Sequence, residues 1–313
     1  MTFALASVSH SPMLGRVDPG GTIYDEIMAA IERVKTFVEE FDPEVVVSFG
    51  PDHFNGVLYE MMPQFAIGAQ AVGVGDWGTV EGPLPVDSDT ARALHRGVIA
   101  RDVDCPLSER LRVDHGMLQT VEFIFGEGEI GKPFVPVFVN ALGVPLSPMR
   151  RIRLFGEALG AAALELDKRV LFLSSGGLSH DPPVPIFLES ERPVQERLTA
   201  AEITLEMRQA REAQILASAK RRASAEGVAM KPANEEWDRE LLRVFASNDL
   251  TQADAWEHEW MVNEGGSAAE EMRAWLAAFA ALSAGGNYDI VEENYWASEP
   301  WGGGFGVVTA RTA

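Results

Sequence analysis

The sequence of 313 residues predicts a single α/β domain. The first indication is a series of short apolar runs, each long enough for one buried strand, separated by segments with helical periodicity. The second is that several of these runs end at small residues, proline and a histidine. Open α/β sheets place their ligands at such strand ends. The third is that no internal repeat or low-complexity tract is present, which favours one domain over a repeat array.

The predicted core elements alternate along the first half of the chain. Four apolar runs are expected to form buried strands, at 3–8, 45–49, 134–139 and 169–173. Helices are expected at 22–41, 87–100 and 148–166, where apolar residues recur with the spacing of one buried helix face. A shorter helical segment begins at His115 and runs to Phe125.

The remaining segments are less regular. Residues 54–85 are rich in glycine, proline, methionine and aromatic side chains, and we expect long loops or short edge strands there. Residues 189–226 are charged and helix-prone, and we interpret them as a surface excursion or lid. The helical insertion that contains this stretch is placed at about 189–231 of the single catalytic domain. Three further helices are expected at about 235–246, 252–260 and 267–284. A glycine-rich turn at 301–306 is then expected to precede a last strand at 307–310.

Composition excludes several classes of protein. The 26 basic and 47 acidic residues give a net charge of −21, which argues against a nucleic-acid surface. An anionic substrate would therefore need a locally basic pocket. The single cysteine, Cys105, excludes an internal disulfide and favours a reducing cytoplasm. Neither a signal peptide nor an apolar run long enough to span a membrane is recognisable, so we expect a cytoplasmic protein without a membrane partner.

Histidines mark the predicted strand ends. Four of the six lie at strand ends or helix starts beside Gly, Pro, Ser or Asp, and they are His10, His53, His115 and His180. Any one of them alone is readily explained as a turn residue. Four in equivalent topological settings favour a shared site. The other two, His95 and His258, lie among charged helical residues and are expected to be solvated.

A carboxylate is needed to complete one kind of metal site, because two histidines and one carboxylate leave open positions on a non-haem Fe(II) ion. In the helix expected at 267–284, Ser267 is the predicted N-cap and Glu270 occupies the capping-box position. Glu271 projects from the same side as Trp275, toward the core. From spacing alone, Glu271 is equally well explained as a rim carboxylate paired with a basic residue.

Other kinds of functional site are less well supported by the sequence or remain alternatives to an iron site. The segment Ser174–Gly177 resembles a phosphate cradle, but the chain lacks a dinucleotide or P-loop pattern. The same serines lack the G-x-S-x-G elbow of a hydrolase nucleophile. A zinc hydrolase using two histidines and a glutamate remains an alternative, as does a metal-free binding protein on the same fold. Metal analysis distinguishes the zinc hydrolase from the dioxygenase: iron together with oxygen uptake indicates a dioxygenase, whereas zinc without oxygen uptake indicates a hydrolase.

The histidine motifs occur in a specific order along the chain. They are Ser9-His10-Ser11-Pro12, Pro51-Asp52-His53-Phe54-Asn55-Gly56, Val113-Asp114-His115-Gly116 and Gly176-Gly177-Leu178-Ser179-His180-Asp181-Pro182-Pro183-Val184-Pro185. Together with the helix from Glu271 to Phe279 and the tail Gly304-Phe305-Gly306, they resemble the class III (LigB-type) extradiol ring-cleavage dioxygenases over nearly the whole chain. The resemblance implies a LigB-like fold, with a central mixed sheet flanked by helices in one domain.

The resemblance also implies an assignment of roles. The Fe(II) ligands would be His10, His53 and Glu271. The acid–base pair would be His115 and His180, supported by Asp114 and by Pro182 on the substrate side. The implied substrates are O2 and a 3-substituted catechol of the 2,3-dihydroxyphenylpropionate type, cleaved to a ring-opened semialdehyde-type product. We expect a homo-oligomer that binds neither nucleic acid nor membrane.

Overall fold

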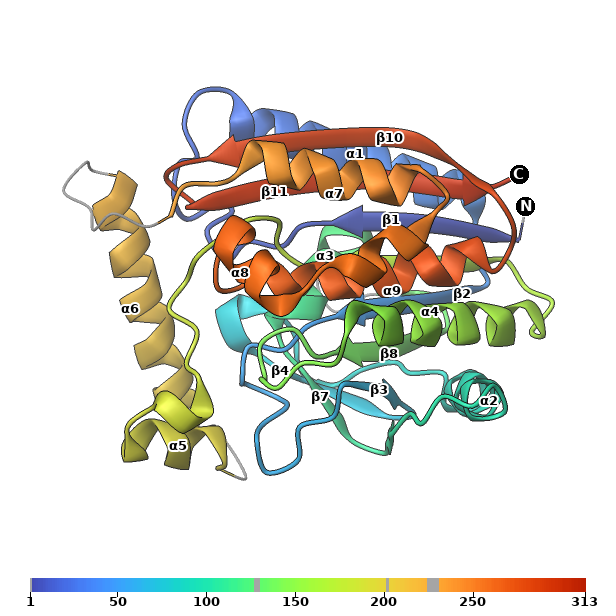
Figure 1. The fold of residues 1–313 in the computed structure, drawn as a ribbon, viewed down its shortest axis with the longest axis horizontal. Helices are drawn as coiled ribbons and strands as arrows, with labels where there is room; N and C mark the ends of the chain where they lie inside the picture. The colour runs from blue at the N-terminus through green and yellow to red at the C-terminus, as the bar shows by residue number, and fades with distance from the viewer. Residues whose placement is uncertain (1, 127–129, 201–202, 224–230) are drawn as a thin grey trace.

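An eight-stranded mixed sheet runs through the computed structural model, which describes residues 2–126, 130–200, 203–223 and 231–313. The strand order is β10-β11-β1-β9-β2-β8-β3-β6 (Figure 1). The four central strands are β1 (Phe3–Val8), β9 (Val170–Ser175), β2 (Val45–Gly50) and β8 (Phe134–Val139), and they are mutually parallel. The outer strands are β10 (Tyr288–Ser298), β11 (Gly303–Thr312), β3 (Phe65–Gly68) and β6 (Leu107–Ser108). The predicted α/β fold with a central mixed sheet flanked by helices is confirmed.

The central strands are buried on both faces, which explains why each reads as an unbroken apolar run. Side chains alternate across a strand, so Phe3 and Leu5 of β1 enter one core cluster while Ala4 and Ala6 enter the other. Because the four strands are parallel, their carboxyl ends lie at one edge of the sheet. The motifs of His10, His53 and His180 follow three of these carboxyl ends and are thereby brought together.

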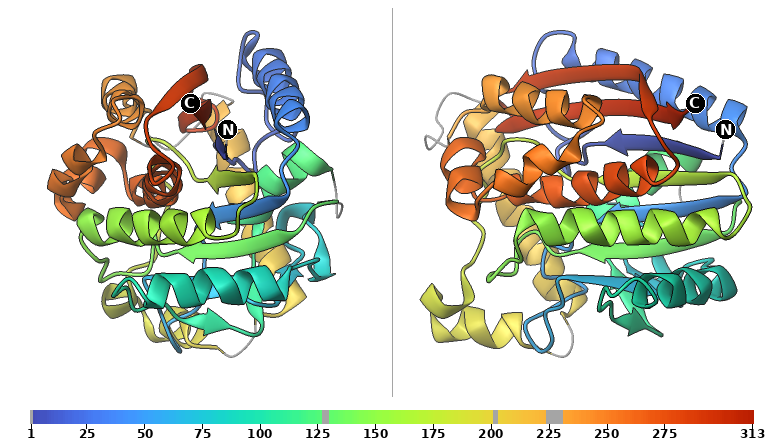
Figure 2. Two further views of the ribbon diagram at one scale, coloured as in Figure 1. Left: turned by 90° about the vertical axis from the view of Figure 1, so that its right-hand side faces the viewer. Right: turned by 45° about the vertical axis from the view of Figure 1, so that its right-hand side comes forward.

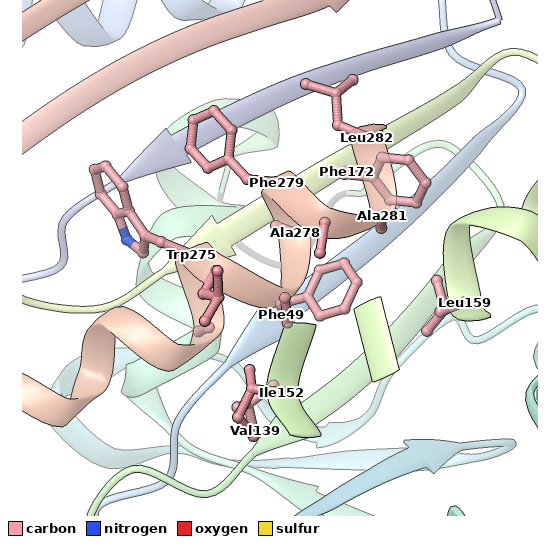
Figure 3. Close-up of a cluster of buried hydrophobic side chains, with 14 of the residues drawn as sticks. Phe49, Val139, Ile152, Leu159, Phe172, Trp275, Ala278, Phe279, Ala281 and Leu282 are labelled. Carbon is pink, nitrogen blue, oxygen red and sulfur yellow. The ribbon is translucent and has the colours of Figure 1, made fainter. Parts of the chain in front are cut away.

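Helices cover both faces of the sheet (Figure 2). One face packs against α1 (Ile23–Phe41) and α3 (His115–Phe125), and the other against α2 (Ser88–Ile99), α4 (Met149–Leu164) and α9 (Met272–Ser283). Figure 3 shows side chains of α9, α4 and the sheet gathered in one buried cluster. The contact between α4 and α9 is close, since a Cβ on Gly156 would lie 2.3 Å from the carbonyl oxygen of Ala277. This packing holds the N-terminus of α9 against the sheet.

A second, three-stranded sheet is formed by β4 (Ala71–Val74), β5 (Glu81–Pro83) and β7 (Leu111–Val113). Between β4 and β5 the chain forms a short 3-10 turn, η1 (Asp76–Gly78). Short strands inside 54–85 agree with the sequence prediction. The parallel pairing of β4 with β7 brings η1 toward the start of α3, where His115 lies.

The charged segment forms η2 (Phe187–Glu189), α5 (Arg192–Leu198) and α6 (Leu205–Ala223). In Figure 1, α5 and α6 lie beyond the carboxyl end of β1, apart from the helices that cover the sheet. The predicted boundary near 231 adjoins residues 224–230, which are outside the described residues, so the limits of the insertion stay a prediction. The chain continues with α7 (Glu235–Ala246), η3 (Leu250–Ala255), α8 (His258–Gly265) and η4 (Ala269–Glu271).

Two helix predictions are wrong in the C-terminal third, and one strand there is missing from the prediction. The helix expected at 252–260 is two elements, because the backbone is extended at Trp256 and Glu257. The helix expected at 267–284 begins as η4 and becomes α-helical only at Met272. Strand β10 was not predicted at all. It is an edge strand with charged residues on an exposed side, so it lacks the apolar run that marks the central strands.

No helix in the described parts of the chain combines the length and the apolar character needed to cross a membrane.

Candidate active site

The four predicted histidines meet at the carboxyl edge of the parallel strands. His10 follows β1, His53 follows β2, His180 follows β9, and His115 begins α3. The Nε2 atoms of His10 and His53 are 3.3 Å apart. The rings of His53 and His115 stack with centroids 4.3 Å apart. The shared site inferred from four histidines at strand ends or helix starts therefore exists as a cluster of side chains.

Glu271 joins this cluster from the other side, at the junction of η4 and α9. Its Oε1 lies 3.2 Å from Nε2 of His53 and 3.3 Å from Nε2 of His180. Its Oε2 lies 3.6 Å from Nε2 of His10 and accepts a hydrogen bond of 2.6 Å from the backbone N–H of Gly177. The carboxylate is fully buried. Glu271 is therefore not a rim carboxylate, and no lysine or arginine among the described residues is paired with it.

The set His10, His53 and Glu271 fits a divalent metal ion. Two donor atoms bound at right angles to one ion at about 2.1 Å lie about 3 Å apart. Nε2 of His53 lies 3.3 Å from Nε2 of His10 and 3.2 Å from Oε1 of Glu271, and Nε2 of His10 lies 3.6 Å from Oε2 of Glu271. A second set, His10, His53 and His115, brings its ligand atoms within 4.8 Å of one another. The first set includes an anionic donor, so it is the better candidate metal site.

A chain of hydroxyl groups orients the ring of His10. Oγ1 of Thr120 donates to the carbonyl oxygen of Val8 at 3.0 Å. The same Thr120 hydroxyl also donates to Oγ of Ser175 at 2.9 Å, and Oγ of Ser175 lies 3.0 Å from Nδ1 of His10. This contact occupies Nδ1 of His10 and leaves Nε2 directed toward His53 and Glu271, where a metal would bind.

Asp114 does the same for His53. Its Oδ2 accepts from the backbone N–H of His53 at 2.8 Å and lies 3.3 Å from Nδ1 of that ring. The amide of Asn55 donates to the same oxygen at 2.9 Å, and the N–H of Gly116 donates to Oδ1 at 2.9 Å. A carboxylate that holds Nδ1–H directs Nε2 toward the metal position. Gly116 is required here, since a Cβ would lie 2.7 Å from the His53 ring.

The electrostatics of the three candidate ligands suit metal binding. Burial lowers the pKa of His10 to about 3, so this imidazole is neutral at ordinary pH. Burial alone would raise the pKa of Glu271, but the charge of His180 and hydrogen bonds from His180 and His53 hold that pKa well below its usual value. For His53, burial is outweighed by the Asp114 carboxylate, which holds the pKa well above its usual value. A metal ion would replace the proton that His53 otherwise attracts.

The ring of His115 is held by a carboxylate that sequence analysis missed. Oδ2 of Asp76 lies 2.5 Å from Nδ1 of His115, and Oδ1 accepts from the backbone N–H of the same residue at 2.9 Å. Asp114, the partner expected from the sequence, lies 3.7 Å from this nitrogen and chiefly contacts His53. Both His115 and Asp76 are buried.

His180 is oriented by its own loop. Nδ1 donates to the carbonyl oxygen of Leu178 at 2.7 Å, which leaves Nε2 facing Glu271. The preceding Ser179 is anchored by Asp238, which accepts from its N–H and its hydroxyl at 2.7 Å each. Gly177 allows the His180 ring to lie close to the backbone of this loop, because a Cβ at residue 177 would lie 2.4 Å from that ring.

The segment after His180 is tied to the start of η4. Asp181 accepts from the backbone N–H of Ser267 at 2.9 Å, and the carbonyl of Pro182 accepts from the Ser267 hydroxyl at 2.5 Å. Ser267 is therefore occupied in joining two loops, and the predicted N-cap is wrong. Glu270 is not a capping-box residue either. It is buried and contacts Arg273 at 2.6 Å and His258 at 2.7 Å.

The residues that the sequence did not reveal have one property in common. Each positions a histidine of the site and is not itself a proposed contact of the metal or the substrate. Thr120 lies inside a helix and carries no local signal. The sequence suggests Ser175 only as a nucleophile or phosphate contact. Asp76 lies between two glycines in a segment read as loop, and only the parallel pairing of β4 and β7 brings it to His115. His95, expected to be solvated, is hydrogen-bonded at 2.8 Å to the carbonyl of Cys105.

Comparison with known proteins agrees with this geometry. The family model described as the catalytic LigB subunit of aromatic ring-opening dioxygenase matches residues 4–306. A crystal structure of an uncharacterized protein from Escherichia coli K12 superposes with a TM-score of 0.51 over 98% of each chain. Its sequence is 14% identical, so this likeness concerns the fold alone.

Similar curated proteins carry one name, 2,3-dihydroxyphenylpropionate/2,3-dihydroxicinnamic acid 1,2-dioxygenase. The protein of Rhodococcus jostii (strain RHA1) is 47% identical over 99% of this chain and 98% of its own length. The corresponding proteins of Mycolicibacterium paratuberculosis and Burkholderia vietnamiensis are 44% and 40% identical, again over 99% of this chain and over 99% and 98% of their own lengths. The chain belongs to the LigB family of aromatic ring-opening dioxygenases.

Proposed function

We propose that this chain is a non-haem Fe(II)-dependent extradiol dioxygenase that cleaves a 3-substituted catechol of the 2,3-dihydroxyphenylpropionate type. The observation that carries the proposal is the convergence of His10, His53 and Glu271, with 3.2–3.6 Å between their donor atoms. Two neutral imidazoles and one carboxylate on one side of an ion are typical of non-haem iron oxygenases. The names of the relatives support the choice of substrate.

Each proposed ligand is oriented by a specific neighbour. His10 is held through Ser175, and His53 through Asp114. Glu271 accepts a hydrogen bond from the N–H of Gly177, and the charge of His180 keeps the buried carboxylate ionised by lowering its pKa. Bound Fe(II) would supply open positions for the catechol oxygens and O2, together with electrons that it exchanges with them.

The proposed base is His180. Its Nδ1–H is committed to the carbonyl of Leu178, so Nε2 is the atom that takes a phenolic proton from the catechol. Burial alone would lower the pKa of His180, but the Glu271 carboxylate outweighs burial and raises it. The imidazolium formed by proton transfer is therefore stabilised beside Glu271.

The proposed acid is His115. Asp76 holds its Nδ1, so Nε2 is again the atom available for exchange, and the stacked ring of His53 keeps the imidazole in place. A proton delivered from Nε2 would assist cleavage of the O–O bond. The organic substrate is oxidised and both oxygen atoms enter the product, so no external reductant is needed. The bond that breaks lies beside the two hydroxyl-bearing carbons, which gives a semialdehyde-type product.

Anaerobic loading with Fe(II), followed by oxygen-uptake assays across substituted catechols, tests this proposal. We expect one O2 consumed per catechol and a product with one aldehyde or ketone and one carboxylic acid. A muconic diacid would contradict extradiol cleavage. Full activity in a zinc-loaded, iron-free sample would contradict the dioxygenase itself and favour the hydrolase alternative.

Several further statements stay predictions. A homo-oligomer, a cytoplasmic location and a helical insertion at about 189–231 are expected from the sequence. Light scattering of the purified chain would check the first. Pro182 lies in the loop after His180 and is partly exposed, as a residue that contacts substrate would be.

A further inference from the structure

Helix α6 brings a guanidinium group to the loop that carries His53. Nη1 of Arg211 donates to the backbone carbonyl of His53 at 2.7 Å. The next residue, Glu212, accepts from the backbone N–H of Trp77 at 2.8 Å, so the helix is also tied to the turn that contains Asp76. Arg211 therefore contacts the backbone of a residue whose side chain is a proposed metal ligand.

A second guanidinium approaches from α5. The backbone N–H of Tyr59 donates to the carbonyl of Leu198 at 2.8 Å, and Leu198 is fully buried in a cluster that includes Phe54. This contact docks the end of α5, where Arg197 lies, on the same loop. Burial and the positive charge of Arg211 lower the pKa of Arg197.

Neither arginine has an acidic partner among the described residues. The ion pairs found there, with nitrogen and oxygen within 4.0 Å, include Arg153 with Asp254 and Arg273 with Glu270, but none involves Arg197 or Arg211. An anion lying between the two guanidiniums would relieve their repulsion and accept hydrogen bonds from donors that are otherwise unused.

Arg211 could instead serve only to offset the negative charge beneath it. The carboxylates of Asp52, Asp76 and Asp114 attract it, and burial lowers its pKa despite that attraction. These carboxylates already accept several hydrogen bonds each. Asp52 accepts the backbone N–H groups of residues 55, 56 and 57. Within the described parts of the chain, the one hydrogen bond of Arg211 goes to the carbonyl of His53, so the other N–H groups of its fork are available there for an additional acceptor.

We propose that Arg211 and Arg197 bind the carboxylate at the end of the substrate's 3-substituent and so select acid-bearing catechols over uncharged ones. The inference rests on the proposed function, because it assumes that the catechol ring lies at His10, His53 and Glu271. A guanidinium pair is suited to a carboxylate, since each fork can donate two parallel hydrogen bonds. It also supplies the locally positive site that an anionic substrate needs in a protein of net charge −21.

The test compares two substrates that differ only in charge, 2,3-dihydroxyphenylpropionate and 3-propylcatechol. In Arg211→Gln, kcat/KM for the acid is expected to fall roughly 10- to 100-fold, mainly through KM, the usual effect of losing one charge-assisted hydrogen bond. For 3-propylcatechol, kcat/KM should change less than about threefold. Arg197→Gln should show the same pattern with a smaller loss. Arg211→Lys should keep part of the preference for the acid.

The matched controls are exposed cations on the same two helices, Arg192→Gln on α5 and Lys220→Gln on α6. Both should keep wild-type kinetics for both substrates, although each removes one positive charge. Equal losses for the acid and for 3-propylcatechol in Arg211→Gln, with an unchanged melting temperature, would mean that Arg211 only offsets the aspartates. That result overturns the proposal, and so does an unchanged preference for the acid.

A binding measurement separates this inference from the proposed function. 3-Phenylpropionate has no hydroxyl groups to bind a metal, so its affinity for the full chain can be measured by calorimetry whether or not the chain turns over catechols. We expect 3-phenylpropionate to bind more tightly than 3-phenylpropanamide, and Arg211→Gln to abolish the difference. Failure of oxygen uptake with this preference intact would refute the proposed function alone. Equal binding of acid and amide to the parent chain would refute the inference.

Discussion

Asp76 and His115 are joined twice, through Oδ2 to Nδ1 at 2.5 Å and through Oδ1 to the backbone N–H at 2.9 Å. The carboxylate thus fixes both the position of the residue and the orientation of its ring. It also holds the ring proton on Nδ1, so that Nε2 faces the site. The amide of Asn55 bridges Asp76 and Asp114, and this links the support of His115 to the support of His53.

Asp76→Asn should lower kcat roughly 10- to 100-fold, because a neutral amide holds the required form of His115 less firmly. The iron content should stay near that of the parent, since Asp76 is not a proposed ligand. The decisive measurement is a double-mutant cycle with His115→Gln. If Asp76 acts through His115, the double variant should be no slower than His115→Gln alone. Additive losses would contradict this role. Asp89→Asn, an exposed carboxylate on α2, is the control.

His115→Gln and His180→Gln should both keep iron and lose activity. Glutamine preserves some hydrogen bonding but cannot exchange a proton, so each variant should lose roughly 10²–10⁴ in turnover, the usual contribution of one positioned acid or base. Metal analysis after anaerobic reloading checks the first half of the prediction. A folded variant that cannot be reloaded with iron would identify that histidine as a ligand and refute its assignment as acid or base.

Glu271→Gln should lose iron and activity together, because it removes the only carboxylate in the proposed ligand set. The matched control is its neighbour Glu270→Gln, which should keep iron but melt at a lower temperature. Glu270 is buried against Arg273 at 2.6 Å, and breaking a buried ion pair costs about 3–5 kcal/mol of unfolding free energy. If Glu270→Gln is the variant that loses metal, the assignment of Glu271 fails.

Thr120→Val should weaken metal binding although Thr120 does not touch the metal position. The valine keeps the shape of the side chain but cannot donate to Oγ of Ser175, so the hydroxyl beside Nδ1 of His10 is no longer held in place. Loss of such an orienting group typically costs 10- to 100-fold in metal affinity. Thr120→Ser keeps the hydroxyl and should bind like the parent. Affinities measured by competition with a chelator check the pair, and equal affinities in the two variants would contradict the hydroxyl chain.

The fold followed from the sequence where packing is local and apolar. The central strands are buried on both faces, so their composition alone marks them. Strand β10 was missed because one of its sides is exposed and carries charges, and only its pairing with β11 makes it part of the sheet. Tertiary contacts also decided the role of Ser267, although the sequence around it has the pattern of a helix cap. Its hydroxyl bonds to Pro182 instead, because two distant loops meet there.

The site residues likewise fall into those that local sequence reveals and those that only the tertiary structure reveals. The sequence by itself determined the histidines, because each follows a recognisable strand or begins a helix, and the ordered motifs identify the family. Only the tertiary structure decided that Glu271 faces them, that Asp76 rather than Asp114 holds His115, and that Thr120 and Ser175 orient His10. Arg211 reaches His53 from 158 residues away along the chain. Such partners carry no local pattern, because a hydrogen bond depends on the distance between two atoms in space and not on their separation in sequence.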